Sequence, residues 1–241
     1  MTDVDLLSIV QPADGWFAVV GVKGSGADIK RQQHLVETRE EVDALTARMV
    51  RNKWNVFFGV AKYATDENRK KTNVQALRAF WLDIDCGPTK AIPNPKTGRP
   101  DGYIDQATGL QALQAFCKTV GLPRPLLVNS GRGIHVYWPL TRDVTREEWE
   151  PVANRLRELC NTHNLIVDPV VFEVARILRI PGTLNFKDDP PKQVTVICDS
   201  SPVEFNEFRK LLGVKETKPL EVPQRPRSNL DRKSTRLNSS H

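Results

Sequence analysis

The chain has 241 residues, of which 39% are hydrophobic and 27% are charged, and its formal net charge is +6. This size fits one catalytic domain, or one domain with a small appendage. No apolar run is long enough to cross a bilayer, and the acidic N-terminus lacks the layout of a signal peptide. We therefore expect a cytoplasmic protein without a membrane partner.

Cysteine spacing and net charge indicate which metals and partners to expect. The four cysteines are widely spaced and none forms a C-x-x-C pair; they are Cys86, Cys117, Cys160 and Cys198. Zinc ligands usually come in closely spaced pairs, so we expect no zinc site. The positive net charge favours a polyanionic partner, because clustered Lys and Arg are the usual footprint of nucleic-acid binding.

Part of the positive charge lies at the C-terminal end of the chain. Residues 231–241 match an in-frame translation of a common sequencing adapter, and we interpret them as an artefact foreign to the natural gene. They carry a net charge of +2, which leaves +4 for the rest. The Pro-rich, charged stretch 214–230 is typical of a linker, and we expect it to lead toward a missing downstream region. Residues 1–213 are then expected to fold as the main domain.

The expected elements interleave strands with helices. Apolar, β-branched runs predict strands, and apolar residues at helical spacing behind a capping residue predict helices. In chain order the strands are expected at 16–22, 55–63, 79–86, 126–129, 134–140 and 194–199, the helices at 38–52, 105–120, 145–159 and 202–212, and long loops at 65–72 and 88–102. This order indicates an α/β or α+β domain.

A pair of acids lies within the expected strand 79–86. Asp83 and Asp85 occupy positions i and i+2, so both carboxylates project from one face of the strand. Hard divalent cations such as Mg²⁺ bind one or two carboxylates together with substrate phosphates. An isolated pair of this kind is more often two solvated acids on an edge strand, but the apolar neighbours here favour a buried strand that opens into a cleft.

A glycine-rich turn follows the acid pair. Residues 130–135, Ser-Gly-Arg-Gly-Ile-His, predict a strand, a tight turn and a second strand. Two glycines allow backbone N–H groups to converge into an anion-binding nest. The residues expected to bind a triphosphate are Ser130, Gly131, Arg132, Gly133 and His135. The alternative is an ordinary hairpin turn in which His135 is a satisfied core histidine.

A third segment supplies another carboxylate. Asp168 follows the apolar residues 165–167 and is expected to end a strand as the third metal ligand. Glu173 is the competing candidate and is placed second.

Basic residues follow that acid. Arg176 and Arg179 are three apart, which predicts one side of a helical turn. After a turn at 181–183, Lys187 is expected to share a face with Asn185. The alternative for Arg176 and Arg179 is a solvated basic face, and we interpret the basic run 69–71 as a solvated loop.

In this order the three segments resemble the motifs of the archaeo-eukaryotic primase (AEP) superfamily, in particular the primase-polymerases of phages, plasmids and other mobile elements (the RepB-like branch). The acid pair, the glycine turn and Asp168 match the three motifs, and 176–187 resembles the mobile-element branch. The resemblance covers roughly residues 16–199. It implies an AEP-type catalytic core, in which an N-terminal α/β unit joins an RRM-like sheet and the active site lies in the cleft between them.

The resemblance also implies a function for residues 1–213. They would form a template-directed nucleotidyltransferase that synthesises or extends primers on single-stranded DNA from NTPs or dNTPs. Asp83, Asp85 and Asp168 would hold two divalent ions, Mg²⁺ or Mn²⁺, and His135 would join them as a catalytic residue. The phosphate charge of the nucleotide or template would be neutralised by Arg176, Arg179 and Lys187. A fused or separate replicative helicase is the expected partner. Some members of the superfamily carry a zinc-binding insertion, for which this chain has no ligands.

Two other function classes are compatible with parts of this sequence. A non-catalytic, single-strand-binding replication initiator with a degenerate primase or RRM-like fold would need exposed aromatics on its sheet. Only 7% of the residues are aromatic, and three acids would repel a nucleic-acid backbone unless metal is present. A rolling-circle nicking enzyme would need a pair of metal-binding histidines, and the motif offers one.

Overall fold

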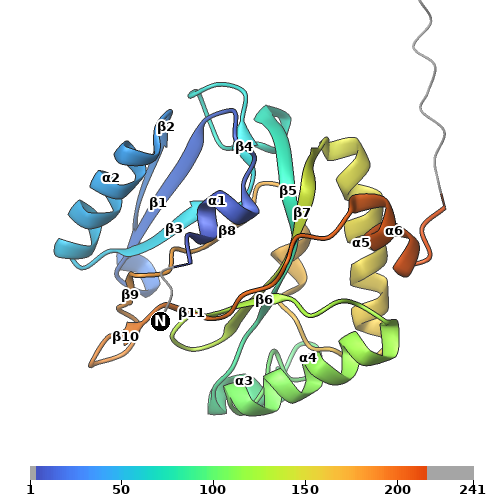
Figure 1. Ribbon diagram of the computed structural model, residues 1–241. Coiled ribbons are helices and arrows are strands. Elements are labelled where there is room, and N and C mark those ends of the chain that lie inside the picture. The colour runs from blue at the N-terminus through green and yellow to red at the C-terminus, as the bar shows by residue number, and fades with distance from the viewer. Residues whose placement is uncertain (1–3, 216–241) are drawn as a thin grey trace, which may run out of the picture.

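Two antiparallel sheets form the frame of the chain, which the computed structural model describes for residues 4–215 (Figure 1). The larger sheet has the strand order β11-β6-β7-β5-β4 and the smaller one the order β2-β1-β3-β8. The larger sheet consists of β4 (Lys62–Tyr63), β5 (Val74–Ile84), β6 (Leu126–Asn129), β7 (Ile134–Val144) and β11 (Thr195–Cys198). The smaller sheet consists of β1 (Phe17–Lys23), β2 (Lys30–Val36), β3 (Asn55–Gly59) and β8 (Ile177–Arg179). A separate hairpin pairs β9 (Leu184–Asn185) with β10 (Lys192–Gln193).

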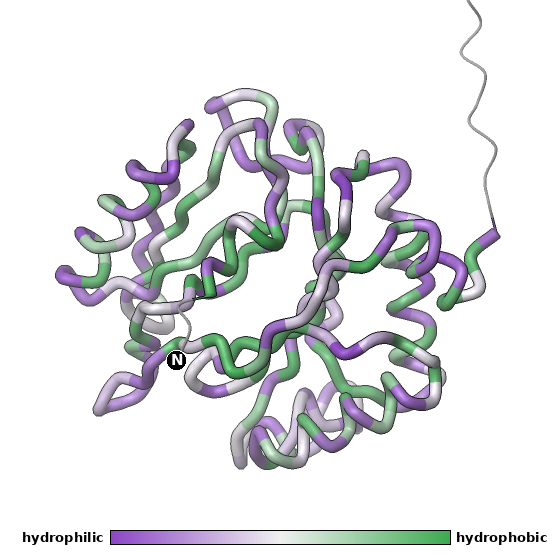
Figure 2. Tube along the Cα trace, in the orientation of Figure 1, coloured by the Kyte–Doolittle hydropathy of each residue, from purple (hydrophilic) through white to green (hydrophobic). Residues whose placement is uncertain are grey.

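Helix α2 lies on the outer side of the smaller sheet, α4, α5 and α6 lie on the outer side of the larger sheet, and α1 lies between the two sheets (Figure 1). The helices within residues 4–215 are α1 (Leu6–Val10), α2 (Arg39–Arg51), α3 (Pro88–Ala91), α4 (Gln106–Val120), α5 (Arg146–Thr162) and α6 (Phe205–Leu211). Short 3₁₀ turns lie at η1 (Gly26–Asp28), η2 (Lys71–Asn73) and η3 (Pro169–Phe172). Hydrophobic and hydrophilic residues alternate along α2 and α4, and the tip of the β9–β10 hairpin is hydrophilic (Figure 2). No helix within residues 4–215 has both the length and the apolar composition needed to cross a membrane.

Capping side chains fix where the long helices begin. Thr38 accepts a hydrogen bond from the backbone N–H of Glu41, and Thr145 accepts one from Glu148, each pair forming the expected capping box. Asp105 likewise caps α4 through the N–H of Thr108. These three helix starts were predicted from the sequence and are confirmed.

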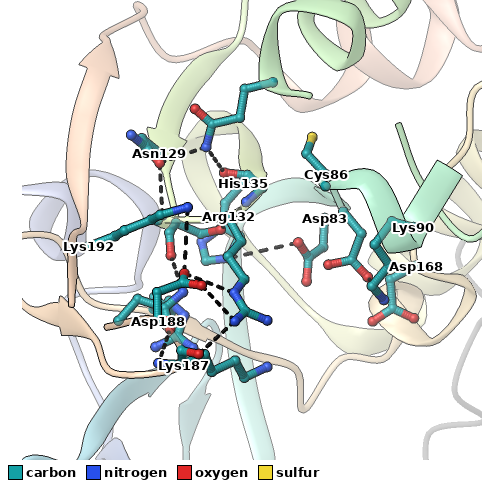
Figure 3. Close-up of a pocket in the computed structure, with 18 of the residues that line it drawn as sticks. Asp83, Cys86, Lys90, Asn129, Arg132, His135, Asp168, Lys187, Asp188 and Lys192 are labelled. Atoms are coloured by element: carbon teal, nitrogen blue, oxygen red, sulfur yellow. Dashed lines mark hydrogen bonds and ion pairs between the residues drawn. The ribbon is translucent and has the colours of Figure 1, made fainter. Parts of the chain in front are cut away.

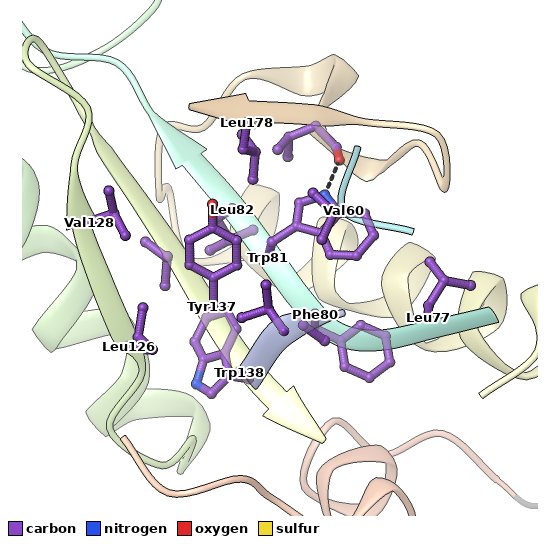
Figure 4. Packing of buried hydrophobic residues seen from close by; sticks show 14 of the residues in the cluster. Val60, Leu77, Phe80, Trp81, Leu82, Leu126, Val128, Tyr137, Trp138 and Leu178 are labelled. Atoms are coloured by element: carbon purple, nitrogen blue, oxygen red, sulfur yellow. Dashed lines mark hydrogen bonds between the residues drawn. The ribbon is translucent and has the colours of Figure 1, made fainter. Parts of the chain in front are cut away.

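The core centres on β5 and β7, where large aromatic side chains are fully buried (Figure 4). Trp81 and Trp149 stack with ring centroids 4.6 Å apart, and Phe80 stacks on Trp149 at 5.6 Å. The indole N–H of Trp81 donates to the carbonyl of Val171 at 2.7 Å. This bond ties η3 to the middle of β5, and therefore fixes the segment that carries Asp168 relative to the strand that carries Asp83.

Several expectations about local structure are wrong. The expected strand 55–63 divides into β3 and β4, which belong to different sheets. The expected loop 88–102 contains α3. Residues 165–167 form no strand, and Asp168 caps η3 instead. Arg179 ends a strand that pairs with β3, so the expected helical turn from 176 to 179 is absent.

Several elements were not predicted, among them β2, α1 and the β9–β10 hairpin. β2 is a polar strand, and α1 precedes the first predicted strand. The α+β class is confirmed. Of the expected linker at 214–230, only residues 214 and 215 are described, and the expected artefact at 231–241 lies outside the described residues.

Candidate active site

A cavity of about 1390 Å³ lies between the two sheets and takes side chains from both of them. Ligand pockets for small molecules usually measure about 300–1000 Å³, so this cavity has room for more than one small ligand. Apart from the second-placed candidate Glu173, every residue that the sequence singled out as a site residue lines it; these are Asp83, Asp85, Ser130, Gly131, Arg132, Gly133, His135, Asp168, Arg176, Arg179 and Lys187. The chain therefore brings the three motifs into one place, while the roles assigned to them stay predictions.

Three carboxylates form the acidic end of the cavity (Figure 3). Asp83 lies at the end of strand β5 and Asp85 directly follows the strand, so both face the cavity as their i, i+2 spacing predicts. The backbone N–H of Asp168 donates to the carbonyl of Asp83 at 2.9 Å, which holds the third acid beside the first. Glu173 is exposed and does not line the cavity, and this favours Asp168 as the third acid.

The electrostatic environment of Asp83 is unusual. Its side chain is only 18% exposed. Burial, followed by the negative charge of Asp85, raises the pKa of Asp83 to about 6. Placing charged carboxylates side by side out of water is unfavourable, so this end of the cavity favours a cation.

Two cationic side chains balance the acids. One guanidinium nitrogen of Arg176 lies 3.4 Å from Asp83 Oδ2 and also contacts Asp168 Oδ2. The ammonium of Lys90, on α3, lies 2.6 Å from Asp85 Oδ2. Arg176 was predicted as a phosphate-binding residue rather than as a partner of the acids. Lys90 was not predicted, because it lies in a Pro- and Gly-rich segment that gives no periodic signal.

His135 lies between the acidic end and the glycine turn (Figure 3). It is directly opposite Asp83 in the β5–β7 pairing, and its Nε2 is 3.9 Å from Asp83 Oδ1, which is beyond hydrogen-bond distance. Burial, helped by the nearby Arg179 and Arg176, lowers the pKa of His135 to about 3, so the ring is neutral. Its Nδ1 is buried without a hydrogen-bond partner. A buried polar atom of this kind is one that a bound ligand or water can satisfy.

The glycine turn closes on itself. The N–H of Gly131 donates to Asn129 Oδ1 at 2.8 Å, and the N–H of Gly133 donates to Ser130 Oγ at 3.1 Å. Gly131 has a φ of +91°, and a Cβ there would meet Asn185 at 2.8 Å, so the position requires glycine. The expected nest of free N–H groups is wrong for these two amides in the described arrangement. Any anion held here would depend mainly on side chains.

Basic side chains form the opposite end of the cavity. Arg132 donates from Nε and Nη2 to both carboxylate oxygens of Asp188, at 2.9 and 2.8 Å, and also to the carbonyl of Lys187. Lys192 lies 3.6 Å from the same Asp188. Asp188 and Lys192 belong to the β9–β10 hairpin and were not predicted. Figure 3 shows this cluster on the far side of His135 from the acids.

Arg179 connects the cavity to the smaller sheet. It is 4% exposed, donates to Asn55 Oδ1 at 2.9 Å, and places its guanidinium 4.7 Å from the centre of the Phe57 ring. Burial lowers the pKa of Arg179 to about 10, so it remains cationic at neutral pH. Arg179 thus contacts residues of the smaller sheet, whereas Arg176 contacts the acids.

The donor set at the acidic end fits a hard divalent cation. Among residues 4–215, no group of three or more His, Cys, Asp or Glu side chains is already arranged as a metal cage. Mg²⁺ needs only one or two carboxylates when substrate phosphates supply further oxygens. Three carboxylates lie along one wall, and their charge is held by Lys90 and Arg176. The three acids therefore share two cationic partners and are not preformed as a metal cage.

Known proteins match this chain in structure but not in sequence. No protein-family model matches the chain, and no curated protein matches it. Among solved structures it is similar to the AEP domain of the primase-polymerase of cyanophage S-2L. The identity is 17%, the match covers 82% of this chain and 89% of that one, and the TM-score is 0.59.

Two further solved structures are similar at lower scores. Primase RepB′ matches with 13% identity over 82% of this chain and 56% of that one, at a TM-score of 0.48. The polymerase domain of Mycobacterium tuberculosis Ligase D, solved in complex with DNA, matches with 12% identity over 86% and 83%, at 0.46. The likeness to the cyanophage domain carries the conclusion: the chain has the fold of the archaeo-eukaryotic primase domain.

Proposed function

We propose that this chain is a template-directed nucleotidyltransferase, a DNA primase or primase-polymerase, which makes or extends primers on single-stranded DNA in the replication of a phage, plasmid or other mobile element. One observation carries the proposal. Three carboxylates and a neutral, buried histidine face a cluster of basic side chains across one large cavity. Nucleotidyl transfer needs this combination, because acids that hold metal must lie close to cations that hold a triphosphate.

The acidic end would carry the chemistry. Asp83, Asp85 and Asp168 would hold divalent cations, which when bound would lower the pKa of the attacking 3′-hydroxyl and stabilise charge at the α-phosphate. Arg176 contacts Asp83 and Asp168 and would keep these acids in place. The neutral imidazole of His135 would donate a hydrogen bond to a phosphate oxygen of the nucleotide.

The basic end would bind the β- and γ-phosphates. Arg132 presents a planar guanidinium that engages two oxygens at once, a geometry that suits phosphate as well as carboxylate. Lys187 and Lys192 line the same wall. Asp188 occupies the fork of Arg132, so an incoming triphosphate would exchange with a carboxylate rather than fill an open site.

The part of the cavity along the smaller sheet would take the template. Val22, Arg31 and Phe57 lie on one face of this sheet and line the cavity. Arg31 is exposed and Phe57 is partly exposed. An aromatic ring beside a cation is the combination that single-strand-binding proteins use to stack bases and hold the backbone. A fused or separate replicative helicase would supply the strand.

A second candidate function is a non-catalytic, single-strand-binding initiator. It is favoured by the ion pairs that Lys90 and Arg176 make with the acids, since a neutralised acidic end would no longer repel a strand. Both candidates predict binding of single-stranded DNA.

Nucleotide incorporation separates the two candidates. The experiment incubates the full chain with single-stranded template, with and without an annealed primer, labelled NTPs or dNTPs, and Mg²⁺ or Mn²⁺. We expect labelled products that need template and metal. Strand binding without incorporation under every metal and nucleotide would instead support the initiator.

A further inference from the structure

The contact between Lys90 and Asp85 is the feature that the proposed function leaves unexplained. Lys90 Nζ lies 2.6 Å from Asp85 Oδ2, so it occupies one oxygen of an acid that would hold metal. Lys90 itself lines the cavity, with 41% of its side chain exposed. Its position is therefore at the mouth of the acidic end rather than inside the core.

Backbone contacts hold Lys90 at this position. The carbonyl of Lys90 accepts hydrogen bonds from the N–H groups of Asp101 and Gly102, each at 3.0 Å. The N–H of Tyr103 donates to the carbonyl of Asp85 at 2.9 Å. A Cβ at residue 102 would lie 2.2 Å from that carbonyl, so this approach requires glycine. The segment from α3 to Tyr103 thus returns to the end of β5 and keeps the ammonium beside the carboxylate.

An ammonium and a divalent cation cannot share this oxygen without strong repulsion. Asp85 can give its Oδ2 to a metal ion only if Lys90 moves away or the two positive charges lie within a few ångströms of each other. Because the side chain is flexible and partly exposed, it is free to leave the carboxylate while its backbone stays anchored.

We propose that Lys90 is a built-in counter-ion that competes with the divalent cation for Asp85 and so sets the metal concentration at which the site loads. This inference rests on the proposed function, because it assumes that Asp85 binds metal. Without metal, Lys90 relieves the repulsion between Asp85 and Asp83. With metal, the freed ammonium remains at the cavity wall, where it can meet a phosphate of the nucleotide.

The test is a calorimetric titration of the apoprotein with Mn²⁺ alone, without nucleotide or DNA. We expect Lys90→Met to bind Mn²⁺ about tenfold more tightly than the unaltered chain, because the competing charge is gone. Lys90→Arg should stay close to the unaltered chain. Lys96→Met is the matched control, since it removes an exposed lysine from the same segment that does not line the cavity. It should leave Mn²⁺ affinity unchanged.

Thermal melting adds a second readout that also reports whether the variants fold. Apo Lys90→Met should melt at a slightly lower temperature than the unaltered chain. Saturating Mn²⁺ should raise the melting temperature of Lys90→Met by more than it raises that of the unaltered chain. Equal or weaker Mn²⁺ binding by Lys90→Met would overturn the inference, as would an equal gain in Lys96→Met, which would indicate a general charge effect. If the unaltered chain binds Mn²⁺ and Lys90→Met changes nothing, only the inference fails. If neither protein binds Mn²⁺, the proposed metal site fails with it.

Discussion

The two ends of the cavity are built in different ways. The acids are attached to the core: Asp83 belongs to a central strand, and Asp168 is held by a backbone bond to Asp83 and by the Trp81–Val171 bond beyond it. The basic cluster of Arg132, Lys187 and Lys192, together with its acidic partner Asp188, lies instead on a tight turn and a two-stranded hairpin. Positions that would need fixed geometry are thus on rigid elements, and positions that would adapt to a ligand are on loops.

Both ends nevertheless share one property, which is that each contains its own opposite charges. Lys90 and Arg176 balance the acids, and Asp188 balances Arg132. Binding at either end would therefore be an exchange of ion pairs rather than the filling of an empty charged site. Exchange lowers the net gain from each contact, because every new pair replaces an old one.

The largest effect is expected at the acidic end. Asp83→Asn should lower nucleotide incorporation by roughly 10³-fold or more, since it would remove one of the proposed metal ligands, which would act as a unit. The melting temperature of the apoprotein should hold or rise, because a largely buried charge beside Asp85 is removed. Asp28→Asn, an exposed acid outside the cavity, is the control and should change neither. Near-normal incorporation by Asp83→Asn would break the assignment of this end to catalysis.

His135 lies where the two ends meet and should affect nucleotide more than strand. His135→Ala is expected to weaken nucleoside triphosphate binding about tenfold, the effect of losing one hydrogen bond to a charged group. Affinity for single-stranded DNA should change little. Fluorescence titrations with a labelled nucleotide and a labelled oligonucleotide measure both, and circular dichroism checks the fold. A larger loss of strand affinity would show that His135 does not serve the nucleotide.

The sheet face offers a matched pair of neighbouring cations. Arg31 and Lys30 are both exposed on β2, but they point to opposite faces, and only Arg31 lines the cavity. Arg31→Ala should weaken single-stranded DNA binding by roughly threefold to tenfold and reduce its salt dependence by about one phosphate contact. Lys30→Ala should have much less effect. Equal losses in both variants would indicate non-specific attraction and would remove the template from this face.

The smallest effect is expected at the hairpin. Asp188→Asn frees Arg132 from its carboxylate partner and should tighten nucleoside triphosphate binding by a few-fold. Asp189→Asn changes the neighbouring acid, which makes no ion pair with Arg132, and should be neutral. Equilibrium dialysis with unlabelled nucleotide checks both. Weaker binding by Asp188→Asn would mean that Asp188 positions Arg132 for the ligand instead of competing with it.

The sequence predicts the parts of the site that depend on local pattern. Strand alternation places Asp83 and Asp85 on one face, and capping residues locate the helices that start after Thr38 and Thr145. β2 was missed because Lys30 to His34 has no apolar alternation, and pairing with β1 stabilises it instead. The same limit applies to Arg179, whose spacing from Arg176 suits a helix but whose strand is set by pairing with β3.

Residues that only the tertiary fold brings to the site leave no comparable signal in the sequence. Lys90 and Asp188 reach the cavity through an irregular segment and a short hairpin, and neither has a motif around it. The amides of the glycine turn show the converse limit. Two glycines correctly indicate a tight turn, yet the side chains of Asn129 and Ser130 decide where those N–H groups donate.

Parallel measurement of incorporation and strand affinity in the unaltered chain and in Asp85→Asn tests the central claim most directly. Both proteins are assayed on the same single-stranded template with Mn²⁺ and labelled nucleotide. The two-ended site predicts template-dependent product from the unaltered chain, none from Asp85→Asn, and equal or tighter strand binding by the variant, since a negative charge has been removed. Product formation by Asp85→Asn, or loss of incorporation and strand binding together, would contradict it.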